Sequence, residues 1–357
     1  MLKALIAMSG GVDSSVAAYL MKQAGYDCIG AMMRLFDGDA EGRESTCCSL
    51  EDAEDARSVA FRLSIPFYVF NFTGDFKTQV IDRFIDAYER GLTPNPCIDC
   101  NRFLKFERLY GRAKELGCDC IVTGHYARIE QSSGRYLLKK ALDASKDQSY
   151  VLYAMTQEQL AHTKFPLGKT EKTETRRIAQ EQEFCNARKK DSQDICFVPD
   201  GDYSKVIEDY TGKRYPSGRF VDSNGKTLGE HGGLIRYTIG QRKGLGISAP
   251  EPLYVCEKRT KENEVVLGSD ETLYKKELNV GDFNWIAYEY PPEQLRAKVR
   301  IRYRQPEQWA TITSTSENSV HIEFDEPQRA VAPGQAAVVY DRDIVLGGGI
   351  ICSDMEG

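Results

Sequence analysis

The sequence has few histidines, no long apolar run and no excess of positive charge. Its four histidines are scattered, and His162, His231 and His321 have no partner pattern, so we expect surface or core roles for them. No apolar stretch is long enough to span a bilayer, and the first residues resemble a core strand and not a signal peptide, so we expect a cytosolic protein. A net charge of -6 argues against generic nucleic-acid binding but allows a local basic patch.

What the chain does contain is typical of a globular enzyme. With 357 residues, 41% of them hydrophobic, it predicts two or three domains. Eleven cysteines in a reducing compartment do not indicate a disulfide framework, so metal binding, catalysis or burial must explain them.

The amino-terminal stretch predicts a strand, a glycine turn and a helix. Residues 2–8 form an apolar run of strand length, residues 9–15 interrupt it, and residues 16–24 have helical apolar spacing. Adjacent glycines let the backbone turn tightly toward a ligand, and Asp13 or Ser14 can cap the helix. The positive end of the helix dipole then favours an anion in the turn.

The turn differs from the common phosphate loop and resembles another one. The Gly-Lys-Thr at residues 168–170 has Thr163 where the first glycine of that loop belongs. The sequence Ser-Gly-Gly-x-Asp-Ser at residues 9–14 resembles the pyrophosphate loop (PP-loop) of ATP pyrophosphatases, which adenylate a carbonyl oxygen. The alternative is an ordinary glycine turn that opens a βα unit.

Alternating strands and helices predict an α/β fold with a doubly wound parallel sheet in the first part of the chain, and the resemblance of residues 9–14 to the PP-loop implies that it is adenine nucleotide alpha hydrolase-like. The expected strands are 28–35, 67–72 and 120–123, and the expected helices are 50–63, 76–90 and 101–116. Two prolines fix a rigid loop at residues 93–96. Ligands bind at the carboxyl ends of such strands, so Ser9, Met33, the proline loop and Gly124 should share one cleft.

The later part of the chain predicts β structure. A hairpin is expected at residues 130–140 and a helix at 173–182, followed by a cysteine-bearing loop at 191–197. Short strands and glycine turns then indicate a small, mainly β domain and a carboxy-terminal β-barrel. We therefore predict three domains, at residues 1–202, 203–276 and 277–357.

Three cysteines lie in loops where thiol chemistry is plausible. Cys97 and Cys100 stand just before a helix, whose amino terminus stabilises thiolates. Cys196 lies in a separate loop flanked by Asp191 and Asp194. We expect the remaining cysteines to be structural or buried: Cys28, Cys47, Cys48, Cys185, Cys256 and Cys352.

A structural zinc site is the alternative for two pairs of cysteines. Cys97, Cys100, Cys118 and Cys120 almost form two paired-ligand knuckles. The second pair has one intervening residue where a knuckle has two or more, and it begins a strand, so burial explains it equally well.

Residues 296–304 alternate basic and apolar side chains. In a strand, the period of two places five positive charges on one face (Arg296, Lys298, Arg300, Arg302 and Arg304), with Ala297, Val299, Ile301 and Tyr303 inside the barrel. A basic row in an acidic protein favours a phosphate backbone, although a solvated outer face is the simpler alternative. Arg188, Lys189 and Lys190 extend this track in our prediction.

Together these motifs are similar to those of the tRNA-specific 2-thiouridylase family, essentially from end to end. The matching segments are 9–14, 93–101, 123–126, 146–150, 191–197, 240–246 and 302–305. The resemblance implies sulfur transfer to C2 of the wobble uridine, position 34, in tRNAs for glutamate, lysine and glutamine. ATP with Mg²⁺ would adenylate O2, releasing pyrophosphate, and sulfur would displace AMP. The sulfur would come as a persulfide from a cysteine desulfurase through relay proteins.

The resemblance also implies roles for individual residues. Cys196 would carry the persulfide, and Cys100 would attack as nucleophile or resolve the disulfide. The implied ATP-binding residues are Ala7, Met8, Ser9, Gly10, Gly11, Val12, Asp13, Ser14, Met33 and Gly124. The implied target-base residues are Asn95, Pro96 and Cys97. The implied tRNA-binding residues are His125, Lys146, Asp147, Gln148, Arg302, Tyr303 and Gln335.

One position departs from the family pattern. Many relatives have aspartate, a proposed general base, where this chain has Cys97, and Asp99 is in the wrong register to replace it. One hypothesis is that Cys97, Cys100 and Cys196 ligate a 4Fe-4S cluster with one iron open to bind sulfide. The persulfide relay is the other, and three thiolates suit both.

Two rival functions explain fewer features. A PP-loop ligase acting on a small molecule leaves the cysteine loops and the basic strand unexplained. A zinc-stabilised RNA-binding protein leaves residues 9–14 unexplained.

Overall fold

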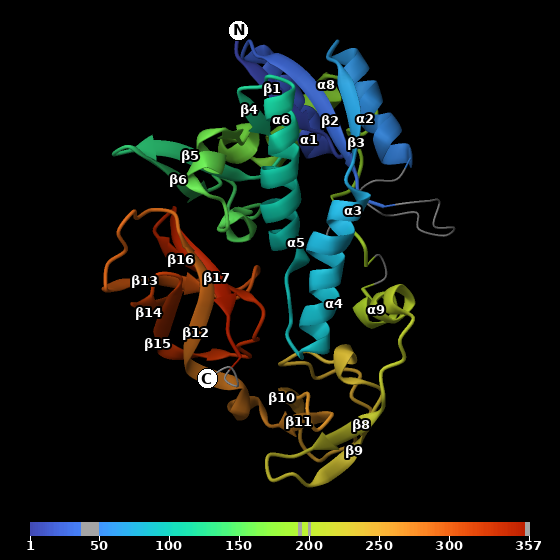
Figure 1. Cartoon of the computed structure of the whole chain (residues 1–357), viewed down its shortest axis with the longest axis vertical. Helices are drawn as coiled ribbons and strands as arrows, with labels where there is room; N and C mark the ends of the chain where they lie inside the picture. Colours follow the sequence, from blue (N-terminus) through green and yellow to red (C-terminus); the bar gives the residue numbers. More distant parts are fainter. Residues whose placement is uncertain (37–49, 192–194, 199–200, 354–357) are drawn as a thin grey trace.

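The computed structural model describes residues 1–36, 50–191, 195–198 and 201–353, which contain three β-sheets (Figure 1). Cys47, Cys48 and Asp194, which we singled out in the sequence, lie outside the described residues. In the described part, no helix has both the length and the apolar composition needed to cross a membrane.

The first sheet is parallel and has the strand order β3-β2-β1-β4-β7. Its strands are β1 Lys3–Ala7, β2 Asp27–Arg34, β3 Phe67–Asn71, β4 Cys120–Val122 and β7 Thr163–Lys164. The middle residues of β1 (Ala4, Leu5 and Ile6) are fully buried, because helices cover both faces of a parallel sheet. The predicted doubly wound sheet is confirmed. β7 was not predicted, because two residues leave no periodicity to detect.

Helices connect these strands where the apolar spacing predicted them, and the helical segments at 96–99 and 157–161 were not predicted. They are α1 Val12–Gln23, α2 Leu50–Arg62, the run α3 Thr73–Phe76, η1 Lys77–Ile81 and α4 Asp82–Glu89, then the run α5 Pro96–Asp99, η2 Cys100–Leu109 and α6 Tyr110–Glu115, and α7 Gln157–Ala161 and α8 Lys172–Glu181. Short 3₁₀ turns lie at η3 Ser149–Leu152 and η4 Pro166–Lys169. The prediction that Asp13 or Ser14 caps α1 was wrong, because α1 starts earlier and Gly11 is its N-cap residue.

The last sheet closes into a six-stranded barrel, as predicted. It contains β12 Tyr274–Trp285, β13 Gln294–Arg300, β14 Gln308–Ser316, β15 Ser319–Arg329, β16 Ala336–Asp341 and β17 Ile344–Ile351, and pairing of β12 with β17 closes it. The expected hairpin is β5 Ala127–Ser132 and β6 Arg135–Lys140, and β6 pairs with β17. This hairpin of the first part of the chain therefore extends the sheet of the barrel, which the sequence did not suggest.

The middle of the chain forms a small sheet with its own core. Its order is β10-β11-β8-β9, from β8 Gly218–Val221, β9 Thr227–His231, β10 Tyr254–Arg259 and β11 Glu264–Gly268, with 3₁₀ turns η5 Leu234–Arg236 and η6 Asp270–Leu273. Phe220, Val255 and Leu267 pack at its centre. The helix α9 Tyr203–Thr211, which precedes this sheet, was not predicted.

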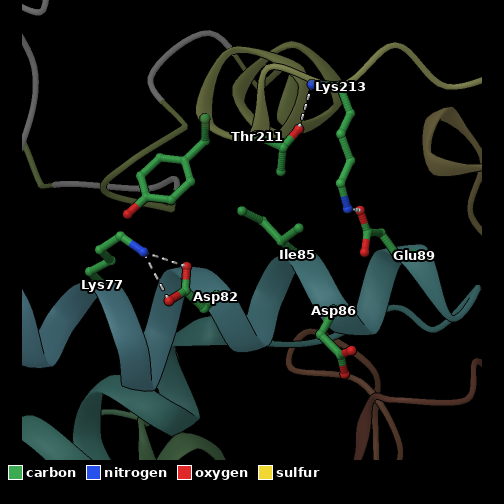
Figure 2. Close-up of a pocket in the computed structure, with 8 residues that line it drawn as sticks. Lys77, Asp82, Ile85, Asp86, Glu89, Thr211 and Lys213 are labelled. Atoms are coloured by element: carbon green, nitrogen blue, oxygen red, sulfur yellow. Dashed lines mark hydrogen bonds and ion pairs between the residues drawn. The ribbon is translucent and has the colours of Figure 1, made fainter.

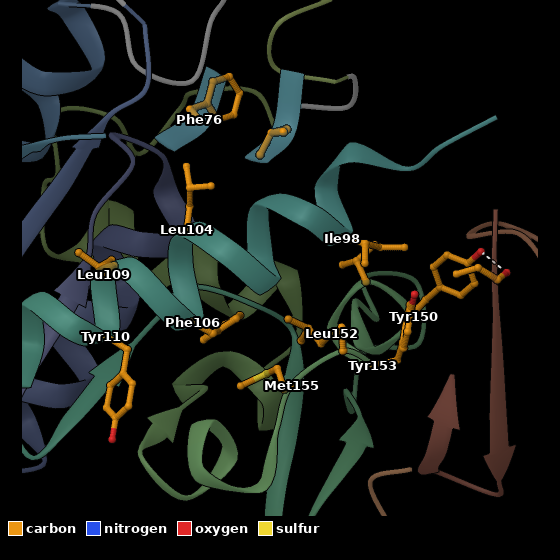
Figure 3. Close-up of a cluster of buried hydrophobic side chains, with 14 of the residues drawn as sticks. Phe76, Ile98, Leu104, Phe106, Leu109, Tyr110, Tyr150, Leu152, Tyr153 and Met155 are labelled. Carbon is orange, nitrogen blue, oxygen red and sulfur yellow. Dashed lines mark hydrogen bonds between the residues drawn. The ribbon is translucent and has the colours of Figure 1, made fainter. Parts of the chain in front are cut away.

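One hydrophobic cluster joins the parallel-sheet unit to the barrel. It contains Leu104 and Phe106 of η2, Tyr150 and Tyr153, and Val338 of β16 (Figure 3). The Tyr150 hydroxyl also donates a hydrogen bond of 2.8 Å to the Ala336 carbonyl oxygen. A continuous core excludes water from the joint, so the barrel is held at a fixed position beside α5 and η2.

Candidate nucleotide and thiol site

The turn between β1 and α1 is a tight loop that only glycine can form at residue 10. Gly10 has a φ of 73°, and a Cβ there would lie 2.4 Å from the Asp52 carbonyl oxygen. The Ser14 hydroxyl accepts a hydrogen bond from the Ser9 N–H at 3.2 Å and donates one to the Gly11 carbonyl at 3.0 Å. The loop is thereby closed by its own side chains at the amino terminus of α1, where backbone N–H groups and the helix dipole favour an anion.

Gly124, at the end of β4, packs directly against this loop. A Cβ on Gly124 would lie 2.8 Å from the Asp13 carbonyl carbon and from the Ser14 nitrogen. After β1 the chain continues to β2 on one side of β1, whereas the next parallel strand after β4 is β7, on the other side. The carboxyl ends of β1 and β4 therefore flank the topological switch point, where doubly wound folds bind ligands. The structure thus brings together residues 9–14 and Gly124, as the sequence predicted. Met33, near the carboxyl end of β2, is partly buried against the main hydrophobic cluster.

A network of charged side chains covers the mouth of the loop. The Lys172 ammonium, at the start of α8, donates to both carboxylate oxygens of Asp13 at 2.7 and 2.8 Å. The Tyr126 hydroxyl donates to Asp13 at 3.1 Å. Sequence reasoning missed Lys172, because it lies 159 residues from Asp13 and belongs to no recognisable motif.

Asp191 is the second carboxylate of this network. It pairs with Lys172 at 2.8 Å, Lys146 at 2.9 Å and Arg176 at 2.7 Å. Burial by itself would raise the pKa of Asp191, but hydrogen bonds from Lys172 and Lys146 outweigh it and hold the pKa at about 2. Asp191 therefore stays ionised, and it anchors the start of the segment that leads to Cys196.

The first cysteine pair lies inside a helical run and not, as was predicted, in a loop before one, because the helix already begins at Pro96. Asn95 is the N-cap of α5, accepting a hydrogen bond from the Cys97 N–H at 3.2 Å, and Pro96 occupies the first turn. The Cys97 side chain is exposed and the Cys100 side chain is partly buried. The continuous helix that follows places its positive end at these thiols, which favours thiolates.

Cys196 packs against the same hydrophobic cluster as Cys100. Its neighbour Phe197 places its ring edge-on to Phe76 and Phe84, with centroids at 5.9 and 5.1 Å. Those two residues belong to the helical run α3–η1–α4, and η1 also packs against α5 and η2. Both cysteine segments therefore adjoin one helical run, although they are 96 positions apart in the sequence.

The described residues lend no support to a metal site. Among them, no three His, Cys, Asp or Glu side chains are gathered closely enough to hold a metal ion. Cys118 and Cys120 are buried, and burial raises the pKa of both thiols. The helix from residue 100 to 115 is about 24 Å long at 1.5 Å per residue, so it separates Cys100 from Cys118.

The loop at residues 93–96 is held by contacts from the barrel and the middle unit. The Thr93 N–H donates to the Pro333 carbonyl, and the Gln335 amide donates to the Thr93 carbonyl, both at 2.8 Å. The Lys258 ammonium donates to the Tyr237 carbonyl at 3.0 Å, and Leu92 lies beside it. Burial lowers the pKa of Lys258 to about 7.

Several residues predicted to bind tRNA lie in joints between structural units. The Arg302 guanidinium donates to the carbonyls of Ile239 and Ala330. The Tyr303 hydroxyl donates to the Asp147 carbonyl at 3.2 Å, and Tyr303 as a whole residue remains 38% exposed. The Asp147 carboxylate is buried and accepts hydrogen bonds from Ala141, Ser149 and the Ser149 hydroxyl.

Of the other residues predicted to contact tRNA, His125 is buried and Lys146 is partly exposed. The buried His125 ring interacts with Lys105 and Thr123, and burial followed by the Lys105 charge lowers its pKa well below the usual value. This burial gives no support to a tRNA contact by His125. Gln148 accepts the Tyr126 N–H at 2.9 Å, and Lys146, bonded to Asp191, remains partly exposed.

The basic row on the barrel is shorter than predicted. The strand β13 ends at Arg300, so the alternation does not continue to Arg304 and Tyr303 does not point into the barrel. The inward positions Ala297, Val299 and Ile301 are buried, as predicted. Arg296 pairs with Asp325 and Arg300 with Glu307, so the charges on this face are partly neutralised.

A polar pocket of about 330 Å³ lies between α4 and α9 (Figure 2). Lys77 pairs with Asp82 and Lys213 with Glu89 along its walls. None of the residues predicted from the sequence lines it, so it contributes nothing to the candidate site.

Comparison with known proteins gives matches along nearly the whole chain. A family model described as the tRNA methyl transferase HUP domain matches residues 2–200, the matching PRC-barrel domain covers 204–269, and an aminomethyltransferase beta-barrel domain covers 275–351. The chain is 52% identical to the tRNA-specific 2-thiouridylase MnmA of Clostridioides difficile, over 98% of both chains. It is 49% identical to the same enzyme of Clostridium beijerinckii, again over 98% of both.

A solved 4-thiouridine synthetase–RNA complex with bound ATP shows a weak likeness to part of the chain. It is 19% identical, with a TM-score of 0.37, over 58% of this chain and 50% of that one. A likeness at this level assigns neither a fold nor a function.

Proposed function

This chain belongs to the tRNA-specific 2-thiouridylase family, and we propose that it converts the wobble uridine of tRNA to 2-thiouridine with ATP. The observation that carries the proposal is the meeting of the Ser9–Ser14 loop with Gly124 at the switch point of the parallel sheet. That edge offers an anion cradle beside a glycine surface onto which a flat adenosine can pack.

In the first step, the uridine O2 attacks the α-phosphorus of ATP, and the bond to the β-phosphate breaks to release pyrophosphate. The backbone N–H groups of the loop and the amino terminus of α1 stabilise the negative charge that develops on the phosphates. The hydroxyls of Ser9 and Ser14 and the carboxylate of Asp13 are hard oxygen donors, which suit Mg²⁺. When bound, Mg²⁺ would supply charge neutralisation for the triphosphate.

In the second step, sulfur replaces the adenylated oxygen. The terminal sulfur of a Cys196 persulfide attacks C2, and AMP leaves with the former O2. The Cys100 thiolate then attacks the inner sulfur of Cys196, which breaks the S–S bond, releases 2-thiouridine and leaves a Cys100–Cys196 disulfide. A thiol reductant restores the enzyme, and a persulfide donor protein reloads Cys196.

The packing of the two cysteine segments supports these roles for Cys196 and Cys100. The segments of both cysteines adjoin the α3–η1–α4 run, and Cys100 begins η2, one turn after the start of α5. Asn95 and Pro96 fix the geometry of the α5 start, where we propose that the flipped uracil lies. Cys97 is exposed at this start.

The soft thiolates of Cys97, Cys100 and Cys196 are chemically suited to an iron–sulfur cluster, but the described residues show no gathered ligand set. We therefore propose the direct thiol route. Iron and sulfide analysis of anaerobically purified protein decides between the two, and a stoichiometric cluster required for activity would replace the persulfide mechanism.

The test of function is nucleoside analysis of tRNA after incubation with ATP, Mg²⁺ and a persulfide source. Wild-type protein should form 2-thiouridine and AMP, whereas Cys100→Ser and Cys196→Ser should not form 2-thiouridine. Cys118→Ser is the matched control, because that thiol is buried at the far end of the η2–α6 helix. Unchanged thiolation in both Cys100→Ser and Cys196→Ser would refute the proposed roles.

A further inference from the structure

We propose that Lys172 is the side chain that binds the β- and γ-phosphates of ATP in this enzyme. The inference rests on the proposed function, since it assigns a ligand to the pyrophosphate that the first step releases. It adds a residue that no motif indicated, on a helix far from the loop in sequence.

The position of Lys172 is the first argument. It is the first residue of α8, and α8 packs against α1, which carries the loop. The side chain is only 10% exposed, and its ammonium meets both oxygens of Asp13. An ammonium next to Asp13 is therefore also next to the loop N–H groups that would receive the phosphates.

The charge of Asp13 is the second argument. A carboxylate at the mouth of an anion-binding loop repels phosphate unless a cation neutralises it. Lys172 is the side chain that donates to both oxygens of Asp13, and the Tyr126 hydroxyl adds a neutral hydrogen bond. Lys172 therefore offsets the repulsion between the Asp13 carboxylate and a polyphosphate in the loop.

The other partner of Lys172 shows how it can turn to a ligand. Lys172 also pairs with Asp191, but Asp191 is bonded to Lys146 and Arg176 as well. Two cations therefore remain on Asp191 if Lys172 moves toward a phosphate oxygen. The Tyr126 hydroxyl remains on Asp13, and the ammonium exchanges one anionic partner for another.

The experiment compares ATP with AMP, because only ATP carries the phosphates that Lys172 would bind. Dissociation constants of both nucleotides are measured by calorimetry at fixed Mg²⁺ for wild type, Lys172→Met and Lys172→Arg. Lys172→Met should weaken ATP binding at least tenfold and change AMP binding less than twofold. Lys172→Arg should recover most of the ATP affinity, since it keeps the charge.

Arg177→Met is the matched control on the same helix. Arg177 is 58% exposed and pairs with Glu174 and Glu181, so its loss should leave both nucleotides unaffected. Equal weakening of ATP and AMP by Lys172→Met would show a structural role and overturn the proposal, as would unchanged ATP binding. If Lys172→Met does not fold, Lys172→Gln retains an N–H donor for Asp13 while removing the charge, and the same criteria apply.

The outcome separates this inference from the function. Wild-type protein that thiolates tRNA while Lys172→Met binds ATP normally would refute only the role of Lys172. If the wild-type protein fails to thiolate tRNA while Lys172→Met selectively loses ATP affinity, the proposed function is refuted and the phosphate-binding role of Lys172 is retained.

Discussion

Replacing Gly124 with alanine tests the contact between the loop and the end of β4. The added Cβ would lie 2.8 Å from two backbone atoms of residues 13 and 14, whereas ordinary contact begins at 3.4 Å. The two segments must therefore separate by about 0.6 Å. Neither contact is a flexible side chain, so the separation displaces the loop itself.

The displacement has a predictable size in binding and stability. Overpacking of this kind costs about 1–3 kcal/mol. A shift of several tenths of an ångström in a positioned site weakens binding or catalysis by roughly tenfold to a hundredfold. We expect Gly124→Ala to raise the ATP dissociation constant by at least tenfold in calorimetry and to lower the rate of AMP formation by a similar factor.

Gly111→Ala provides the control. Gly111 lies in α6, and a Cβ there meets nothing within 4 Å. Alanine at this helical position should stabilise the protein by about 0.5–1 kcal/mol and leave nucleotide binding unchanged. ATP binding by Gly124→Ala within twofold of wild type would refute the claim that this contact shapes the nucleotide site.

Three further predictions follow from individual contacts. Gln335→Leu removes the hydrogen bond to the Thr93 carbonyl and should lower kcat/KM for tRNA thiolation about fivefold, from about 1 kcal/mol, without changing ATP affinity in calorimetry. Because the pKa of Asp191 in the folded state, about 2, lies below its ordinary value of 3.8, its interactions stabilise the fold above about pH 4 and are lost as the pH falls toward 2. Asp191→Asn should therefore remove roughly 2 kcal/mol of acid-sensitive stability in urea titrations at pH 2 to 5, and an unchanged pH dependence would contradict this. Phe197→Ala leaves a cavity that costs about 3–5 kcal/mol and should displace Cys196, so thiolation should fall while ATP binding persists; undiminished thiolation would show that this packing does not position the thiol.

The sequence by itself determined the local structure. Residues 3–7 and 27–34 form strands because their apolar runs are buried in the sheet, and the apolar run at 67–71 forms the more exposed edge strand. The intervening amphipathic segments form helices because they bury one apolar face. The strand–glycine turn–helix order placed the anion loop, because no residue with a Cβ fits at Gly10. Local rules of this kind require no knowledge of distant residues.

The tertiary structure alone decided which distant residues share the site. The pairing of Lys172 with Asp13, the hold of Gln335 on Thr93 and the packing of β6 on β17 all join residues at least 150 positions apart. A lysine or glutamine on a helix or barrel has the same local pattern whether it faces solvent or a partner. Its role is set by burial and by the charge or carbonyl that the fold places next to it. No local sequence pattern predicts which distant residue that partner will be.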